Sequence, residues 1–379
     1  TRYLDLLKAE AQAMEAEIEA ALERVRSQTM AMHNSQDVGK TVVTFFDEVM
    51  KLGLNKSIRC GIGILEDREK METWSATSYP NGDVDLQVGL LDMKRHPLIK
   101  GLETAWKNKE DGYSYELIGE DVVRYYEQLV EEPDYPFHVD LENLSDMEYH
   151  KSFFFSSGII FTFTKTPISE EAASVLKRFA GVFGQTYRRF LDLQKAEAQA
   201  KEAQIEAALE KVRSRTMAMQ ASSERQDAAN VLFLEIQALG INAWSAGYNI
   251  LSDDKTSSTC WMSSEGELQD PFPLYYTDEA SFIEMGTFLK GQDDFFVQEL
   301  QGKALEQHYD YMKSLPELKD TFKHIEDVGL TLPAYQINHL CKFSQGYLLF
   351  ITYEKVPEAH DIFKRFTKVF EQTYTRFLD

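Results

Sequence analysis

The feature that most constrains the fold of this chain is an internal repeat. Residues 1–32 and residues 188–219 differ at seven of 32 positions, which leaves 25 identical at an offset of 187. The similarity continues more weakly, and residues 185–192 match residues 372–379 at the same offset. Convergence does not produce such identity, so the chain contains two copies of one module.

The bulk composition fits two domains. A length of 379 residues suits two or three domains, and 43% hydrophobic residues supply two sizeable cores. The net charge of −22 repels phosphate and anionic lipid, so we expect neither nucleic acid nor membrane as a partner. Cys60, Cys260 and Cys341 form no CxxC pair, which predicts reduced thiols and a cytoplasmic location.

The repeated segments predict long helices before and between the domains. From Ser169 to Met219 there is no proline, and strong helix formers dominate. The expected organisation is an N-terminal signalling helix over 1–34, a first domain over 35–168, a connecting helix over 169–221, a second domain over 222–356 and a C-terminal helix over 357–379.

Apolar residues recur every seven positions along both helices, as in a two-stranded coiled coil. The expected dimer seam consists of Leu4, Ala11, Ile18, Val25, Met32, Leu191, Ala198, Ile205, Val212 and Met219. The other seam position is polar in the second copy, at Gln194 and Lys201. We expect a parallel homodimer whose weak seam changes register easily. The alternative is that these helices pack on their own domains.

Each domain is predicted to be α+β. In the first copy an amphipathic helix ends near Leu52 and is followed by strands over 58–65 and 71–78. A mixed, partly helical middle leads to a second hairpin over 148–165. Hairpins at both ends favour a central antiparallel sheet with its helices mostly on one face.

The end of the first module, GIIFTFTKTPISEE at 158–171, resembles the ending of GAF sensory domains. The repeated string AEAQAxEAxIEAALExVRSxTMAM resembles the signalling helices of bacterial two-component sensors. The resemblance implies two GAF-like α+β domains in series on long coiled-coil-type helices. It also implies further modules and a downstream effector domain in the same chain, such as a histidine kinase.

The signatures of two ligands of that family are incomplete. Asn55-Lys56 is followed by Ser57 with no Asp-Glu in place, which disfavours a cyclic nucleotide. None of the three cysteines has an adjacent histidine, which disfavours a bilin. The cofactor therefore stays open. Neither a phosphate loop nor a metal-ligand spacing occurs, so we predict no metal site and no catalytic residue.

Aromatic and similar side chains on the elements that line GAF-like pockets are the ligand candidates. They are Trp74, Tyr113, Tyr115, Tyr126, Phe153, Trp261, Phe296, Tyr309 and His339, with His339 aligned to Phe153. Ordinary core packing is the alternative for them. The leading hypothesis is a non-catalytic sensory region that relays ligand or partner binding through parallel helices. The alternatives are a ligand-free dimerisation or spacer module, and an enzyme with an unrecognised site.

Overall fold

Two α+β units make up the chain. The computed structural model describes residues 2–32, 36–53, 57–65, 69–78, 84–218, 222–264, 267–327, 329 and 331–378. The boundary between unit 1 (Thr1–Ala196) and unit 2 (Glu197–Asp379) falls inside one long helix. Each unit has a central antiparallel sheet with helices, so the expected α+β fold class is confirmed.

Unit 1 contains a six-stranded sheet of order β3-β2-β1-β6-β5-β4. Its elements are α1 (Arg2–Met30), α2 (Gln36–Lys51), β1 (Ser57–Ile64), β2 (Lys70–Ser78), β3 (Val84–Asp92), α3 (Pro97–Lys107), β4 (Gly112–Ile118), α4 (Glu120–Val130), η1 (Leu141–Asn143), β5 (Met147–Phe155), β6 (Gly158–Thr164) and α5 (Glu170–Met217). The β1–β6 ladder joins the first and last strands.

Unit 2 repeats this arrangement in the order β10-β8-β7-β13-β12-β11, with β9 paired to β8. After α5 its elements are α6 (Ser222–Ala238), β7 (Ala243–Leu251), β8 (Ser257–Ser264), β9 (Glu267–Leu268), β10 (Phe272–Tyr275), α7 (Ala280–Lys290), β11 (Phe295–Gln301), α8 (Gly302–Ser314), η2 (Pro316–Leu318), α9 (Lys319–Asp327), β12 (Tyr335–Phe343), β13 (Gly346–Thr352), η3 (Pro357–Ala359) and α10 (His360–Leu378).

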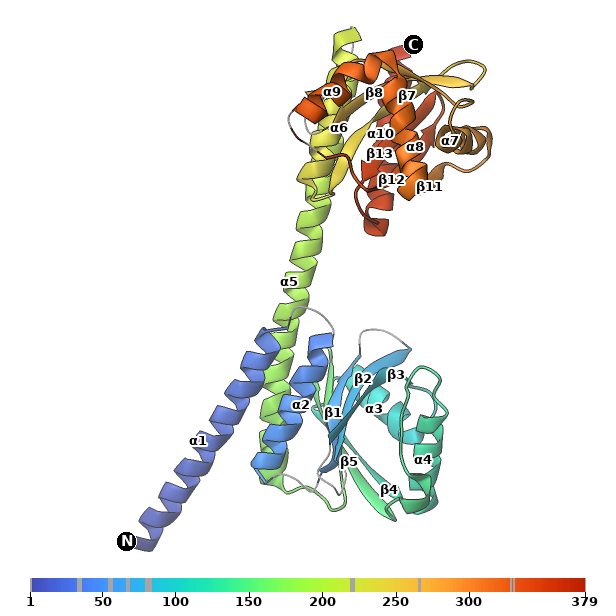
Figure 1. Cartoon of the computed structure of the whole chain (residues 1–379). Coiled ribbons are helices and arrows are strands. Elements are labelled where there is room, and N and C mark those ends of the chain that lie inside the picture. Colours follow the sequence, from blue (N-terminus) through green and yellow to red (C-terminus); the bar gives the residue numbers. More distant parts are fainter. Residues whose placement is uncertain are drawn as a thin grey trace. The chain divides into compact units, whose positions relative to one another are not determined.

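Helices cover both faces of the unit 1 sheet (Figure 1). On one face α1, α2 and α5 bury Val25, Phe45 and Phe179 against the strands. On the other face α3 and α4 each bury four residues. The expectation that the helices lie mostly on one face is therefore wrong. It overlooked the apolar faces of these two shorter helices.

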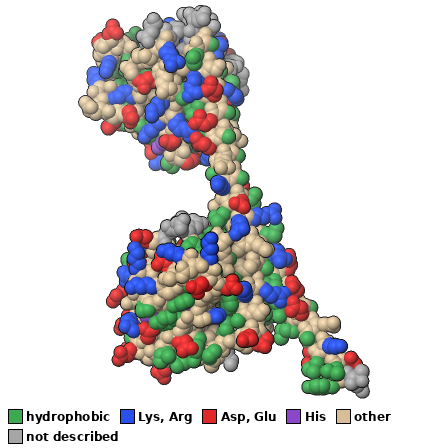
Figure 2. All heavy atoms as spheres, turned by 180° about the vertical axis from the view of Figure 1, so that it is seen from behind, with side chains coloured by type: hydrophobic (Ala, Val, Ile, Leu, Met, Phe, Trp, Pro, Cys, Tyr) green, Lys and Arg blue, Asp and Glu red, His purple; other side chains and the backbone are tan. Residues whose placement is uncertain are grey.

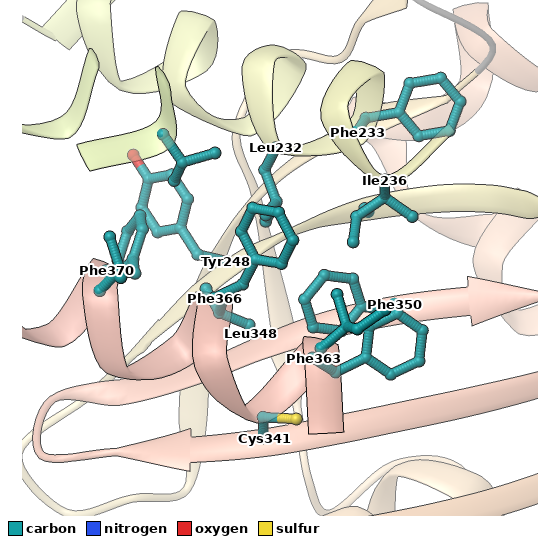
Figure 3. Close-up of a cluster of buried hydrophobic side chains, with 14 of the residues drawn as sticks. Leu232, Phe233, Ile236, Tyr248, Cys341, Leu348, Phe350, Phe363, Phe366 and Phe370 are labelled. Atoms are coloured by element: carbon teal, nitrogen blue, oxygen red, sulfur yellow. The ribbon is translucent and has the colours of Figure 1, made fainter. Parts of the chain in front are cut away.

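In unit 2 the matching layer consists of α6, α10 and the last turns of α5. Figure 3 shows Leu232 and Ile236 of α6 gathered with Phe363 and Phe366 of α10 near Phe350 of β13. The rings of Phe350 and Phe363 stack with their centroids 4.2 Å apart. Burial of each such ring contributes about 1.5–3 kcal/mol, so this layer anchors the helices firmly to the sheet.

The same ion pairs join the first and last helices of both units. In each set, which we call a helix clamp, one arginine of the last helix contacts two glutamates one turn apart on the first helix. The two sets are Arg178 with Glu15 and Glu19, and Arg365 with Glu202 and Glu206. All three members of the second clamp lie 187 positions after those of the first. The repeat therefore preserves the contact between these helices as well as their sequence.

Two matching glycines set the start of α4 and α8. Gly119 has a φ of 57° and Gly302 a φ of 55°, and both directly follow an edge strand. This left-handed conformation is unfavourable for residues that carry a Cβ atom. The two units therefore turn from edge strand to helix in the same way.

Charged side chains of both signs are interspersed over the visible surface of each unit (Figure 2). Hydrophobic side chains gather at the N-terminal end of α1, where Tyr3, Leu4, Leu6 and Leu7 are 43–72% exposed. Within the described ranges, every helix is too short or too polar to cross a lipid bilayer.

Candidate functional site

The second face of the unit 2 sheet holds a pocket. It lies between the strands and helices α7, α8 and α9, and its enclosed cavity measures about 80 Å³. A single water needs about 10–15 Å³ on this scale. The cavity therefore has room for several waters, or for part of a small organic molecule.

Apolar side chains form most of the pocket lining. The strands contribute Met262, Phe272, Leu274, Leu349 and Ile351, and the helices contribute Phe282, Met285, Met312, Phe322 and Ile325. Phe282 and Met285 of α7 are buried, whereas Phe322 and Ile325 of α9 are half-buried. The pocket is therefore more open toward α9 than toward α7.

Three amide side chains, Gln298, Gln336 and Asn338, form what we call the amide row. Asn338 Nδ2 donates to Gln298 Oε1 at 3.0 Å, and Gln336 Nε2 donates to Asn338 Oδ1 at 2.9 Å. The hydroxyl of Tyr309 donates to Gln336 Oε1 at 3.0 Å, and Gln298 Nε2 donates to the Ser281 carbonyl at 3.0 Å. The row is therefore held in one orientation by its own hydrogen bonds.

Asn249 is the polar side chain that this network leaves out. It lies on β7, opposite Cys260 of β8 and Tyr347 of β13, and it is 0% exposed while lining the pocket. Among the described residues, neither Nδ2 nor Oδ1 has a hydrogen-bond partner. A buried polar group left without a partner costs about 1–3 kcal/mol. We therefore expect solvent or a ligand to supply that partner.

The pocket is electrically neutral apart from one histidine. No Asp, Glu, Lys or Arg of the described residues lines it. His308 does, and its Nδ1 lies 3.0 Å from Ser281 Oγ and 3.5 Å from the carboxylate of Glu279. Burial acts to raise the pKa of Glu279, but hydrogen bonds from His308 and Ser281 outweigh it and hold that pKa at about 2. Glu279 is outside the lining and already paired.

In unit 1, Arg59 fills the corresponding space. Its fully buried guanidinium donates to the Tyr125 hydroxyl at 2.7 Å and lies 4.0 Å from the centre of the Phe163 ring. Burial opposes the charge, but the oxygens of Tyr125 and Glu148 outweigh it and raise the pKa of Arg59. The remaining cavity measures about 20 Å³, enough for about one water.

The strand registers show which residues match between the units. Arg59 faces Phe163 across β1 and β6, and the matching pair in unit 2 is Ser245 with Ile351. Three residues that fill the unit 1 space become smaller in unit 2: Arg59 is matched by Ser245, Phe161 by Leu349, and Phe163 by Ile351. These smaller side chains open the unit 2 pocket.

The registers of β5 and β12 show a matching change of chemistry. Glu148 is matched by Gln336 and His150 by Asn338, so two ionisable side chains of unit 1 become members of the amide row. His150 is buried, with Nε2 2.5 Å from Ser152 Oγ. Burial, together with the charge of Arg59, lowers the pKa of His150 to about 3. Unit 1 thus holds a buried glutamate and a neutral histidine where unit 2 holds amides.

The structure places the nine sequence candidates in three groups. Four lie on the face packed against the first and last helices: Trp74, Phe153, Trp261 and His339. Three lie on the edge strands β4 and β11: Tyr113, Tyr115 and Phe296. Two lie on the opposite face, Tyr126 in the buried cluster of unit 1 and Tyr309 in the pocket lining of unit 2. Ligand contact stays a prediction for all nine.

The alignment of Phe153 with His339 is wrong by two residues. In the strand registers Phe153 matches Cys341, and His339 matches Lys151. A shift of two keeps a side chain on the same face of a strand, so the apolar pattern alone did not reveal the error. Sequence reasoning also missed Arg59 and Asn249. The available signal was a polar residue inside an otherwise apolar strand.

The expected seam residues divide into exposed and buried sets. Leu4, Ala11 and Ala198 are exposed. Others are buried or half-buried within their own unit: Ile18, Val25, Met32, Leu191, Ile205 and Val212. Met219 lies outside the described residues, as do Asn55 and Lys56. The homodimer stays a prediction, and only the exposed set is open to a second chain.

Two solved structures illustrate what this chain resembles. A bacteriophytochrome from the photosynthetic bacterium R. palustris aligns at 11% identity and a TM-score of 0.32, over 88% of this chain and 63% of that chain. This chain therefore spans less than two thirds of that bacteriophytochrome. The GAF domain of an Acinetobacter phosphoenolpyruvate-protein phosphotransferase aligns at 13% identity and a TM-score of 0.27, over 45% of this chain and 93% of that domain. No protein-family model and no curated protein sequence matches the chain.

Proposed function

We propose that this chain is a non-catalytic sensory and signal-transmitting region of a larger signalling protein, and that unit 2 takes up a small-molecule input. The pocket of unit 2 carries the proposal. It combines an apolar lining, a self-ordered amide row and the buried Asn249 amide, which has no partner among the described residues. In unit 1 the matching space is occupied by Arg59 and its aromatic neighbours.

The helices are the proposed route of the output. In each unit the pocket face and the helix layer are opposite faces of one sheet, so strand residues alternate between the two. A ligand that binds one arrangement of the sheet more tightly shifts the population of that arrangement. The buried helix layers hold the first and last helices on the sheet, and the helix clamps pair those helices at the surface, so that both move with the sheet. The expected output is a cytoplasmic histidine kinase or another signalling enzyme in the same chain.

The input is tested by thermal unfolding of the whole chain with a set of uncharged and charged small molecules. A ligand at 100 times its Kd stabilises the folded state by about 2.7 kcal/mol. The control is Leu349→Phe, which installs the side chain that unit 1 carries at Phe161. We expect at least one compound to raise the Tm of the wild type and not that of the variant. Equal shifts in both proteins, or none in either, would overturn the input site.

The relay is tested in the longer parent protein by inserting four residues into α5. The best place is 196–200, because these side chains are exposed. Farther along the helix, Ala208 is buried in the core of unit 2, so an insertion there would disrupt packing. Four residues rotate the following helix by about 40°. Altered output supports the relay, and unchanged output counts against it.

A parallel homodimer through α1 completes the proposal. Leu4, Leu7 and Met14 are 61%, 43% and 49% exposed and share one face of the helix. We expect light scattering to give a dimer for the wild type and a monomer for the double variant Leu4→Glu, Leu7→Glu. A monomeric wild type contradicts this part of the proposal and leaves the unit 2 pocket unaffected.

A structural role is the second candidate, and it applies to unit 1. Arg59 has a hydrogen bond and four aromatic rings within 5.5 Å, and little space is left around it. A domain whose pocket is filled in this way serves for spacing or pairing. A compound that stabilises the wild type but not Leu349→Phe assigns sensing to unit 2 and leaves unit 1 with this structural role.

A further inference from the structure

The chemistry of the unit 2 pocket also specifies the class of its ligand. We infer that the pocket takes an uncharged molecule with an apolar ring body and a cis-amide edge, such as a lactam, in which a C=O acceptor lies beside an N–H donor. This inference rests on the proposal that unit 2 takes up a small molecule. It goes further by naming the chemical group that Asn249 recognises.

The unmet hydrogen-bonding demand of the pocket is at Asn249. Its Nδ2 and Oδ1 are a donor and an acceptor in one plane, and both lack a partner among the described residues. Two parallel hydrogen bonds with a cis-amide satisfy both atoms at once. A ligand with only an acceptor or only a donor leaves one atom of this buried amide unpaired.

The amide row does not compete for that ligand edge. The side chains of the row hydrogen-bond to one another, to Tyr309, to the Ser281 carbonyl and, from Gln298 Nε2, to the Glu284 carboxylate at 2.5 Å. The row is a fixed polar wall, whereas Asn249 is a vacant pair of hydrogen-bonding atoms. The ligand is therefore oriented with its polar edge on β7.

Charge excludes the other common ligand classes. A carboxylate, phosphate or ammonium buried in this pocket would need a counter-ion. Among the described residues, no Asp, Glu, Lys or Arg lines it, and the nearby Glu279 is engaged by His308 and Ser281. Unit 1 holds Arg59 and Glu148 at the matching places. The replacement of both by uncharged side chains is specific to unit 2.

The apolar body of the ligand lies toward the open side of the pocket. Asn249 is fully buried, whereas Phe322 and Ile325 of α9, which also line the pocket, are half-buried. Met285 and Met312 belong to the same lining and are adaptable side chains that pack well against aromatic rings. A bicyclic heteroaromatic lactam has both the polar edge and the flat body that this lining requires.

The test uses four probes of nearly equal shape on the whole chain. They are 2-quinolone, 1-methyl-2-quinolone, 2-methylnaphthalene and quinoline-2-carboxylate. We expect 2-quinolone to bind the wild type most tightly in isothermal titration. Methylation of its nitrogen removes the donor and should weaken binding about tenfold or more. The hydrocarbon should bind about as weakly as the methylated probe, and the anion should not bind.

Variants at Asn249 test whether this residue determines which of the four probes binds most tightly. Asn249→Leu should reverse the order, so that 2-methylnaphthalene binds better than 2-quinolone. Asn249→Asp keeps the shape but replaces the donor by a charged acceptor, and it should abolish 2-quinolone binding even if the Leu variant fails to fold. Asn242→Leu makes the same change at an exposed position before β7 and should leave all four affinities unchanged.

The outcomes separate the ligand class from the proposed function. The ligand class is overturned if the hydrocarbon or the anion matches 2-quinolone, or if crystals soaked with 2-quinolone show only waters on Asn249. In either case, compounds that stabilise the wild type but not Leu349→Phe still support the input site. If no compound of any class binds the wild type, both the proposed ligand class and the proposed input site are wrong.

Discussion

Unit 1 and unit 2 share the same arrangement of strands and helices, but they differ in the space on one face of the sheet. That space is filled by side chains in unit 1 and holds a pocket in unit 2. In unit 1 a buried arginine, a buried glutamate and two phenylalanines fill the space between the sheet and α3 and α4. In unit 2 the matching positions carry a serine, a glutamine, a leucine and an isoleucine, and a pocket opens there. The helix clamps and the turn glycines are the same in both units. The duplication thus kept the surfaces that join helix to helix and changed the opposite face of the sheet, where unit 2 has its pocket.

This difference shows how a pocket arises from a core. Removing a large side chain opens a cavity that costs stability unless the site collapses or is filled. Removing Arg59 alone would also leave the buried Glu148 without the neighbouring guanidinium. In unit 2 both are replaced together, so that no Asp, Glu, Lys or Arg of the described residues lines the pocket. The following predictions test this comparison, beginning with the largest expected effect.

The largest effect is expected from Arg59→Ser, which gives unit 1 the residue that unit 2 has at Ser245. Glu148 is 2% exposed and lies close enough to Arg59 to act on its charge. Removing a buried cation from the neighbourhood of a buried carboxyl group costs up to about 3–5 kcal/mol, the loss measured when a buried ion pair is broken. Urea unfolding with hydrogen exchange followed in unit 1 peptides measures the loss.

The double variant Arg59→Ser, Glu148→Gln should be more stable than the single variant, because no buried charge is left unpaired. Arg189→Ser is the control, since Arg189 is exposed. If Arg59→Ser lowers the free energy of unfolding as little as Arg189→Ser does, the buried charge does not stabilise unit 1. The proposed difference between the two interiors is then wrong.

A smaller effect is expected from pH. The pKa of His150 in the folded chain is about 3, against an ordinary value of 6.5. Above pH 6.5 both folded and unfolded chains hold a neutral His150. As the pH falls from there toward 3, the unfolded chain takes up the proton first, so unit 1 loses stability. The contribution of this one group is about 2 kcal/mol between pH 7 and pH 5.

His150→Asn, the residue that unit 2 carries at Asn338, should remove that contribution. The measurement is the free energy of unfolding of unit 1 at pH 7, 6 and 5 in variant and wild type. Other groups titrate equally in both proteins and cancel in the difference. An unchanged slope, or the same change with His138→Asn at an exposed position, would show that His150 is not the source.

The smallest effect is expected at the helix clamps. Their glutamates are exposed, and exposed ion pairs contribute little. Arg178→Ala and Arg365→Ala should each speed hydrogen exchange in the paired helix by about fivefold at most, and 1 M salt should remove the difference from the wild type. A response in one unit and none in the other would break the equivalence of the two clamps.

The sequence predicted the frame of this molecule well, since long regular elements carry strong local signals. The proline-free run from Ser169 became α5, which ends at Met217. The hairpin with Gly158 appeared as β5 and β6. The prediction missed β3, an edge strand in which only Gln87 and Leu91 are buried, so its alternation of apolar and polar residues is weak.

The interior could not be predicted to the same depth. Trp74 and Phe153 are conspicuous in the sequence, yet they face the helix layer. Asn249 is one polar residue in the run Tyr248–Leu251, and nothing local shows which face it occupies. That depends on pairing with strands about 11 and 98 residues farther along the chain, at Cys260 and Tyr347. The local periodicity of a sequence carries no information about long-range strand registers of this kind.

The position of Cys260 makes the rate of its chemical modification a measure of how often the pocket opens. This thiol lines the pocket, and burial raises its pKa to about 12, so in the closed state it hardly reacts with alkylating reagents. Cys60 and Cys341 are buried in the helix layers on the opposite faces of their sheets. Modification of Cys260 therefore proceeds only as often as its pocket opens, and a bound occupant slows it without touching the other two. Mass spectrometry of the three cysteine peptides then measures how frequently the unit 2 pocket opens, before any ligand has been identified.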